Sequence, residues 1–190
     1  MKVENVNVYG LSESVRGAKF PMSVDVSELT DGITKGIDSL GRAEIGSGHD
    51  NFLNGIIVQF DLTCTNKMWV ELQRYHFIDF VSSQSTMHRA SKMNLTECFC
   101  KYVSPNILVE CNRLQKQYNE NPTADNYLRL LYSLPSGMEL TARMTTNYRQ
   151  LKTIYKQRRD HRLPEWGDFC EWMKTLPKSE WIIGVCDERS

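Results

Sequence analysis

The chain has 190 residues, 41% of them hydrophobic, and its 23 lysines and arginines are balanced by 23 aspartates and glutamates. This length fits one domain spanning residues 1–190 and provides enough apolar side chains for a substantial core. The balanced charge argues against a nucleic-acid-binding protein, which would normally carry a basic field, and no apolar run approaches the roughly 20 residues of a membrane span. We therefore expect a single domain that binds neither nucleic acid nor membrane.

Strands and helices are both predicted from the spacing of the apolar residues. In chain order the expected elements are a strand at 2–9, a helix at 32–44, a strand at 56–64, a helix at 66–81, helices at 104–118 and 123–134, a strand at 138–146, and helices at 147–159 and 164–176. The helix at 32–44 is expected to be capped near Ser27 or Thr30. This pattern indicates an α+β fold, with a mixed or antiparallel sheet flanked by several helices.

The segment 66–81 combines a predicted helix with several polar side chains. Apolar residues three or four positions apart predict the helix: Met68, Leu72, Tyr75 and Ile78. On such a helix Glu71, Arg74 and Tyr75 share one face. The hydroxyl-rich stretch 82–90 breaks the pattern and predicts a polar loop.

The first ten residues, MKVENVNVYG, lack the apolar core of a signal peptide, so we expect a cytoplasmic protein whose six cysteines are reduced. Cys98 and Cys100 form the only close pair, and one Cys-x-Cys pair without a second is weak evidence for zinc. His76, His88 and His161 have no short ligand spacing either. We therefore expect no metal site.

Three polar clusters stand out: His49 in its glycine-rich turn, the segment 71–89, and the basic segment 147–162. Each alone has an ordinary interpretation, as an exposed loop histidine, an intrahelical Glu71–Arg74 ion pair or a solvated helix face. Their combination and their order along the chain favour a binding site.

These clusters resemble the flavin-dependent thymidylate synthases, the ThyX family. The stretch GHDNFLNGIIVQFDLTCTNKMWVELQRYH, residues 48–76, is similar to the family's Gly-His turn, strand and helix ending in an Arg-His-Arg signature, which reads Arg74-Tyr75-His76 here. SQSTMHR stands where that signature continues with a Ser, a polar pair and Ser-x-Arg. NYRQLKTIYKQRRDHRLPEW resembles the family's Asn-Ala-Arg-Ser-Leu stretch and the residues that follow it.

The resemblance covers residues 48–89 and 134–166, with several departures. Tyr75 replaces the middle His of the signature, and His76 replaces its last Arg. The other departures are Asn54-Gly55 for a Glu-His pair, Leu131 for an arginine that grips the nucleotide phosphate, and Thr86-Met87-His88 for Ser-x-Arg. Because imidazole is only partly charged near neutral pH, His88 in place of arginine predicts weaker or pH-dependent phosphate binding.

The resemblance implies an enzyme that methylates C5 of the uracil of dUMP to give dTMP, with methylenetetrahydrofolate as carbon donor, FAD as hydride carrier and NADPH as reductant. Arg158 matches the arginine that activates the uracil by stabilising negative charge on the ring. The positions that match flavin contacts are His49, Asn51, Arg74, Tyr75, His76, Asn147 and Arg149. Those that match or adjoin nucleotide contacts are Glu71, Gln84, Ser85, Thr86, His88 and Arg89.

The resemblance also implies a homotetramer whose active sites form between subunits. Two other functions stay open. One is a related flavin-dependent modification of another pyrimidine nucleotide, which the altered phosphate-binding residues suggest. The other is a non-catalytic nucleotide-binding or assembly protein that keeps the fold.

Overall fold

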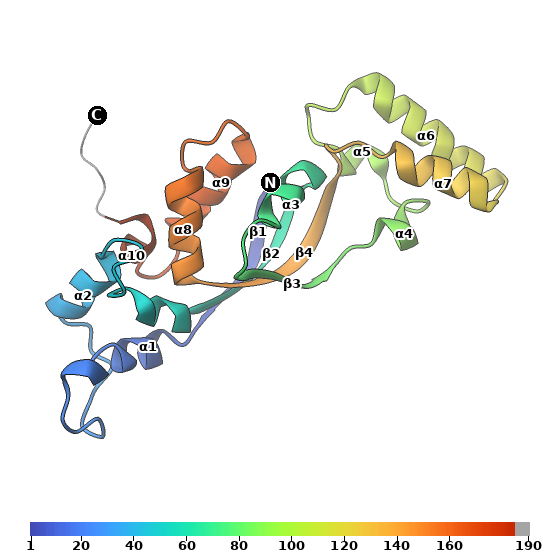
Figure 1. Ribbon diagram of the computed structural model, residues 1–190. Helices are drawn as coiled ribbons and strands as arrows, with labels where there is room; N and C mark the ends of the chain where they lie inside the picture. Colours follow the sequence, from blue (N-terminus) through green and yellow to red (C-terminus); the bar gives the residue numbers. More distant parts are fainter. Residues whose placement is uncertain (185–190) are drawn as a thin grey trace.

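A four-stranded antiparallel sheet in the order β1-β2-β4-β3 lies at the centre of the structure, a computed structural model that describes residues 1–184 (Figure 1). Its strands are β1 (Lys2–Tyr9), β2 (Ile57–Thr65), β3 (Ile78–Ser83) and β4 (Glu139–Asn147). The central strands pair without a break from Ile57 opposite Asn147 to Thr65 opposite Glu139. The sheet and its flanking helices confirm the expected α+β class.

Helices lie on one face of the sheet and at both of its ends (Figure 1). They are α1 (Leu11–Gly17), α2 (Lys35–Arg42), α3 (Asn66–Leu72), α4 (Thr86–Arg89), α5 (Leu95–Cys98), α6 (Pro105–Glu120), α7 (Ala124–Ser133), α8 (Tyr148–Arg158), α9 (Pro164–Met173) and α10 (Glu180–Ile183), with the 3-10 helices η1 (Phe20–Met22) and η2 (Asn51–Gly55). Helices α1, α2 and α10 lie at one end, and α4 to α7 lie at the other. Among residues 1–184, no helix is both long and apolar enough to cross a membrane.

The main core lies between the sheet and the helices α8 and α9. Alternate residues of β2, among them Val58 and Phe60, are fully buried, as expected for a strand with one face on the core. The Phe60 ring lies 4.6 Å from that of Trp172 and 5.9 Å from that of Phe169, both on α9. Burial of such side chains contributes about 1.5–3 kcal/mol each, so this layer holds α9 firmly on the sheet.

A second, smaller core holds together an arm, which comprises α4 to α7. The buried residues of this core are Ala90, Leu95, Cys111, Leu114 and Leu130. The arm is joined to the sheet where β3 ends and β4 begins, and Phe99 pairs with Met138 at this junction. The arm therefore extends from one end of the sheet instead of covering its face.

Most of the predicted elements are confirmed, with ends within three residues of those expected. The confirmed elements are the strands at 2–9, 56–64 and 138–146 and the helices at 104–118, 123–134, 147–159 and 164–176. Side-chain caps explain two of the helix starts. The Thr123 hydroxyl accepts from the N–H of Asn126 at 3.2 Å, and Asn147 Oδ1 accepts from the N–H of Gln150 at 2.8 Å.

The helix predicted at 66–81 is wrong in its second half. Helix α3 ends at Leu72, and residues 78–83 form β3 along the edge of β4, with Ile78 opposite Thr146. The apolar spacing of this segment is compatible with both structures, but its β-branched and aromatic residues suit a strand. A strand here also pairs with the backbone N–H and C=O groups on the free edge of β4. If the helix continued instead, these groups would have no hydrogen-bond partners.

The helix predicted at 32–44 has a different cap from the one expected. Helix α2 begins at Lys35, and the Thr34 hydroxyl accepts from the N–H of Ile37 at 3.3 Å, so neither Ser27 nor Thr30 is the cap. The short helices α1, α4, α5 and α10 were not predicted, and α4 lies inside the predicted polar loop. Helices of this length are unstable in isolation and form only through tertiary contacts, which leave no periodic signal in the sequence.

Candidate functional site

The last turn of α8 meets the end of α3 in a group of charged and aromatic side chains. We call this group the Arg158 cluster, and it consists of Lys67, Glu71, Tyr75, Arg158, His161 and Trp166. Arg158 Nε donates to the Tyr75 hydroxyl at 2.7 Å, and Arg158 Nη1 donates to Glu71 Oε2 at 3.4 Å. The side chains of Arg158 and Glu71 are each 11% exposed. The fold thus brings together three of the residues predicted from separate segments.

Aromatic rings enclose the Arg158 guanidinium. Its Cζ lies 4.7 Å from the centroid of the Trp166 ring and 5.6 Å from that of Tyr75. Trp166 is fully buried, and the two rings meet edge to face with centroids 6.1 Å apart. Cation–π contacts of this kind contribute from about 0.5 kcal/mol at exposed sites to about 2 kcal/mol when desolvated. Arg158 is therefore held in one position, unlike an arginine on a solvated helix face.

Glu71 is the carboxylate shared by the cluster. Trp166 Nε1 donates to Glu71 Oε2 at 2.8 Å, Lys67 Nζ lies 3.4 Å from Oε1, and His161 Nε2 lies 3.6 Å from Oε2. Burial alone would raise the pKa of this carboxyl, but the hydrogen bonds from Trp166 and Lys67 and the nearby His161 hold the pKa below its ordinary value. Glu71 is therefore ionised at neutral pH, and it opposes the charge of Arg158.

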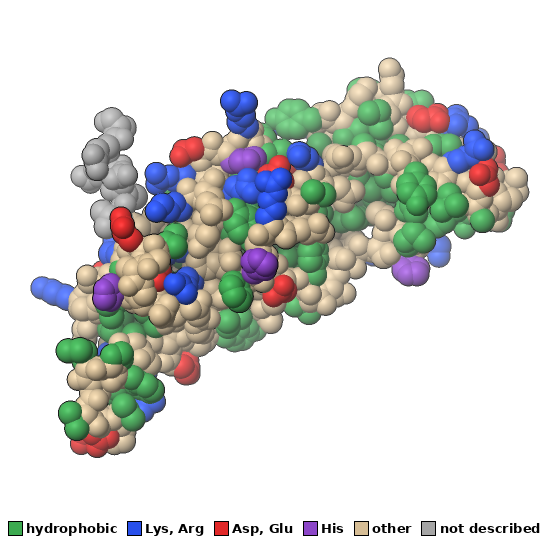
Figure 2. All heavy atoms as spheres, in the orientation of Figure 1, with side chains coloured by type: hydrophobic (Ala, Val, Ile, Leu, Met, Phe, Trp, Pro, Cys, Tyr) green, Lys and Arg blue, Asp and Glu red, His purple; other side chains and the backbone are tan. Residues whose placement is uncertain are grey.

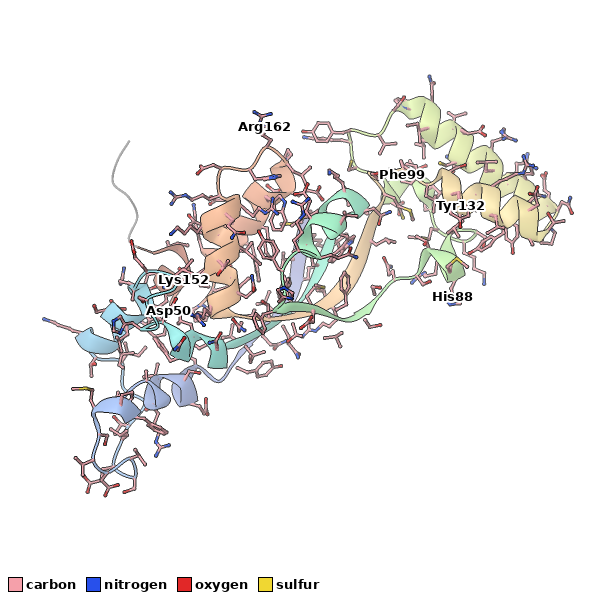
Figure 3. The ribbon with its side chains drawn as sticks, viewed as in Figure 1. Asp50, His88, Phe99, Tyr132, Lys152 and Arg162 are labelled. Carbon is pink, nitrogen blue, oxygen red and sulfur yellow. The ribbon has the colours of Figure 1, made fainter. Side chains whose placement is uncertain are left out.

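A second ionic cluster lies at the start of α8, where η2 packs against it (Figure 3). Asp50 is fully buried, and Arg149 Nε and Lys152 Nζ each lie 3.4 Å from one of its carboxylate oxygens. Neither oxygen accepts a hydrogen bond from any residue in 1–184. Burial lowers the pKa of Lys152, while the Asp50 charge acts in the opposite direction. These ion pairs tie the loop before η2 to α8.

The predicted flavin residues of this region flank the buried Asp50 ion pairs. His49 and Asn51 lie on either side of Asp50 in sequence, and both are exposed. Asn147 is buried, and its side-chain oxygen caps α8 by accepting from the N–H of Gln150. Arg149 is partly exposed beside Asp50. The structure therefore places these residues near one end of α8, on two segments that are joined to each other.

The remaining predicted flavin residues follow α3. Because α3 ends at Leu72, Arg74 and Glu71 do not share a helix face as expected, and no ion pair joins them in the described chain. Arg74 and His76 are exposed in the turn before β3. Tyr75 turns inward to Arg158. Of the predicted signature, Arg74 and His76 are therefore exposed to solvent, whereas Tyr75 belongs to the Arg158 cluster.

The predicted nucleotide residues other than Glu71 lie beyond β3, toward the arm. They are Gln84, Ser85, Thr86, His88 and Arg89. Gln84 continues the sheet, since its N–H donates to the Thr141 carbonyl at 2.9 Å and its Oε1 accepts from the Thr141 N–H at 3.0 Å. Ser85 and Thr86 are partly exposed at the start of α4, whereas His88 and Arg89 on α4 are exposed.

These two groups of predicted residues do not meet within one chain. Figure 3 places His88 at the arm, whereas Asp50 and Lys152 lie at the opposite end of the molecule. The hydrogen bonds and ion pairs of Arg158 within residues 1–184 go to Glu71 and Tyr75, not to the segment 84–89. A single site that uses both groups would need a second copy of the chain.

Basic side chains gather over the α8 and α9 side of the molecule (Figure 2). Lys156, Arg159 and Arg162 are exposed there, and Arg149 is partly exposed. Lysine and arginine at this density favour an anionic ligand, because they donate charge-assisted hydrogen bonds to phosphate oxygens. This local excess of positive charge is compatible with the balanced charge of the whole chain.

The sequence analysis did not assign several residues of these two clusters to a site. Lys67 lies four positions before Glu71 on α3, a spacing that indicates an ion pair on a helix. Trp166 and His161 reach Glu71 only because α9 and the loop before it fold back onto α3. Asp50 carries no local signal of burial, because it lies among glycines and polar residues. Only the packing of η2 against α8 places its carboxylate inside.

Metal ligands and cysteine thiols are the other residue types in 1–184 that could form a site. Among residues 1–184, no group of three or more His, Cys, Asp or Glu side chains is arranged to hold a metal ion. Cys98 and Cys100 are free and partly exposed. Burial raises the pKa of Cys64 far above its ordinary value, and it raises the pKa of Cys170 to about 11, so neither thiol is a nucleophile at neutral pH. Cys186 lies outside the described residues.

Comparison with known proteins identifies the fold. No protein-family model and no curated protein matches the sequence. Two solved structures of the flavin-dependent thymidylate synthase ThyX from Helicobacter pylori, each complexed with FAD and dUMP, are similar to this chain. Each has a TM-score of 0.74 and 16% sequence identity, with coverage of 97% of this chain and 98% of the other. This chain therefore has the fold of the flavin-dependent thymidylate synthases over nearly its whole length.

Proposed function

We propose that this chain is an FAD-dependent methyltransferase of the thymidylate synthase type, which converts dUMP to dTMP. The observation that carries the proposal is the Arg158 cluster, in which an arginine is immobilised against Trp166 and Tyr75 in a chain with this fold. A cation held in place before the reaction stabilises developing negative charge without reorganisation. Arg158 would stabilise the charge that develops on the pyrimidine ring.

The residues around α8 fit the cofactor by their chemistry. Arg149 and the exposed Arg74 and His76 are donors suited to the pyrophosphate of FAD, and the exposed His49 and Asn51 are suited to its polar edges. When bound, FAD would supply the hydride, with NADPH as reductant and methylenetetrahydrofolate as carbon donor. The protein's own contribution is then to bind, to orient and to stabilise charge.

The proposal includes self-association to a homotetramer with sites shared between subunits. Its support is the separation of α8, which carries Arg158, from α4, which carries His88 and Arg89 (Figure 1). Exposed apolar side chains give further support: Phe77 is 63% exposed and Tyr132 is 84% exposed. Large apolar side chains left in solvent often mark surfaces that bind another chain.

The first experiment measures FAD uptake and dUMP methylation by the purified protein and its Arg158→Ala variant. We expect a flavin absorption spectrum in both proteins and a loss of kcat on the order of 10²–10³ in the variant. Arg113→Ala, which removes an exposed arginine of the arm that bonds only to Glu110 and Gln117 in the described chain, is the matched control. Absence of FAD uptake at tens of micromolar would overturn the proposal. Equal loss of FAD binding and activity in Arg158→Ala would contradict the role of Arg158.

The second experiment tests the shared site. Arg158→Ala subunits are mixed with subunits that carry both His88→Ala and Arg89→Ala, and the exchange of subunits is verified by native mass spectrometry. If the site combines both segments from different chains, mixed assemblies recover activity that neither parent has. Mixed assemblies that remain inactive would show that the two segments do not complement one another.

A non-catalytic nucleotide-binding protein is the second candidate. One observation favours it: Glu71 opposes the positive charge of Arg158, which reduces the charge available to a substrate. This candidate predicts binding of FAD or of a pyrimidine nucleotide without turnover. Assays with several pyrimidine nucleotides would also detect the related modification that His88 in place of arginine suggests.

A further inference from the structure

We infer that Glu71 and Tyr75 are positioning residues that fix the Arg158 guanidinium, and that neither contacts the nucleotide or the flavin. The resemblance of the sequence implies that Glu71 binds the nucleotide and Tyr75 the flavin. The contacts of both side chains indicate a different role. The inference rests on the proposed function for the catalytic role of Arg158, whereas the arrangement of the three side chains does not depend on it.

Glu71 has little capacity left to accept a hydrogen bond from a ligand. The residue is only 8% exposed. A carboxylate offers about four lone-pair positions. Its Oε2 accepts from Trp166 at 2.8 Å and from Arg158 at 3.4 Å, and its Oε1 faces Lys67 at 3.4 Å. Two of these positions, both on Oε2, are thus occupied by donors of the protein itself, and Oε1 faces Lys67.

His161 is a third side chain directed at Oε2 of Glu71. Its Nδ1 accepts from the backbone N–H of Leu163 at 3.1 Å, which leaves the ring proton on Nε2. That nitrogen lies 3.6 Å from Glu71 Oε2, on the same oxygen that Trp166 and Arg158 contact. A nucleotide would have to displace one of these donors to reach Oε2.

The Tyr75 hydroxyl is also fully engaged. It accepts from Arg158 Nε at 2.7 Å, and its single proton is donated to Gln157 Oε1 at 3.0 Å. The Tyr75 ring meets the buried Trp166 ring edge to face, so it packs inward. The hydroxyl and one side of the ring of Tyr75 are thus used in contacts within the protein.

These contacts fix the Arg158 guanidinium and use only some of its N–H donors. Arginine has five N–H donors in a rigid plane. One N–H is directed to Tyr75 and one to Glu71, and the Trp166 ring covers the guanidinium at 4.7 Å. The other N–H groups of Arg158 keep their fixed direction and donate to no further residue in 1–184. Because Lys67 also lies against Glu71, the cluster retains a net positive charge.

Two conservative variants separate positioning from direct contact. Glu71→Gln keeps an oxygen that can accept from Trp166 but removes the charge, and Tyr75→Phe keeps the ring but removes the hydroxyl. For a misplaced Arg158 we expect a fall in kcat on the order of 10- to 100-fold, with KM for dUMP and the affinity for FAD near their wild-type values. Tyr102→Phe, at a 72% exposed position before α6, is the control. A raised KM in Glu71→Gln, or weaker FAD binding in Tyr75→Phe, would overturn the inference.

A second readout needs no activity. In protein with ¹⁵N-labelled arginine, the Nε–H signal of Arg158 is identified by its loss in Arg158→Ala. We expect slow exchange of this proton with water in the wild type and fast exchange in Tyr75→Phe, because the hydroxyl that accepts it is removed. Unchanged exchange in Tyr75→Phe would overturn the inference. If the wild type shows neither FAD uptake nor methylation, the proposed function fails, and this measurement still decides whether Tyr75 holds Arg158.

Discussion

Replacement of Lys152 by methionine should destabilise the protein by about 3 kcal/mol, the low end of the range for breaking a buried ion pair. Asp50 is fully buried, and neither of its oxygens accepts a hydrogen bond from residues 1–184. Lys152 and Arg149 are the two cations at 3.4 Å from this carboxylate. Methionine retains most of the volume of the lysine stem, so the cost arises from the uncompensated charge of Asp50 and from the carbonyls of Gly41 and Ala43, to which Lys152 Nζ donates. Because Arg149 remains beside Asp50 and still compensates part of its charge, we expect a loss of stability at the low end of the range.

Urea unfolding and thermal unfolding, both followed by circular dichroism, measure this loss. In a chain of this size 1 kcal/mol shifts Tm by about 2–4 °C, so we expect a fall of roughly 6–12 °C. The double variant Asp50→Asn, Lys152→Met removes both charges and should recover at least half of the loss. Lys156→Met, at an exposed position one turn further along α8, is the matched control. A loss below about 1 kcal/mol in Lys152→Met, or a double variant no more stable than the single one, would refute the reasoning.

Two further predictions concern Glu71 and Gly41. The folded-state pKa of Glu71 lies below its ordinary 4.5, so its charge stabilises the fold above about that pH, and this contribution is lost as the pH falls through the lowered pKa. Urea unfolding of wild type and Glu71→Gln should therefore differ at neutral pH and converge in acid, and a difference that grows in acid would contradict this. Gly41→Ala should lose about 1–3 kcal/mol in thermal unfolding, because its Cβ would lie 2.5 Å from Trp181 Cγ. Gly36→Ala, with only Thr34 at 3.7 Å, should match wild type or exceed it, and equal stability of the two variants would argue against close packing at Gly41.

Much of the fold follows from local signals along the chain. The alternation in β2 predicts a strand with one buried face, and that face is buried. Three helices begin at residues typical of helix starts: α6 at Pro105, α7 after the cap Thr123 and α8 after the cap Asn147. Such signals are local because backbone hydrogen bonds and caps involve neighbours within about four residues.

The candidate site is predicted only in part, because its contacts join distant segments. The sequence selects Glu71, Tyr75 and Arg158 by resemblance, and the structure brings them into contact across up to 87 positions of the chain. It places Trp166 and His161 beside them, which no spacing in the sequence indicates. Within residues 1–184, Arg158 forms no hydrogen bond or ion pair with the segment 84–89.

The sequence by itself determines the class of the fold, the course of its central strands and long helices, and the residue types available for binding an anion. Tertiary structure alone decides where α3 ends and β3 begins, because the segment 78–83 becomes a strand only where β4 presents an unpaired edge. It likewise decides that Asp50 is buried and that Glu71 faces Arg158. Side-chain burial, ion pairs and strand pairing depend on which surfaces come into contact when the chain folds. The periodicity of the sequence does not say which surfaces these are.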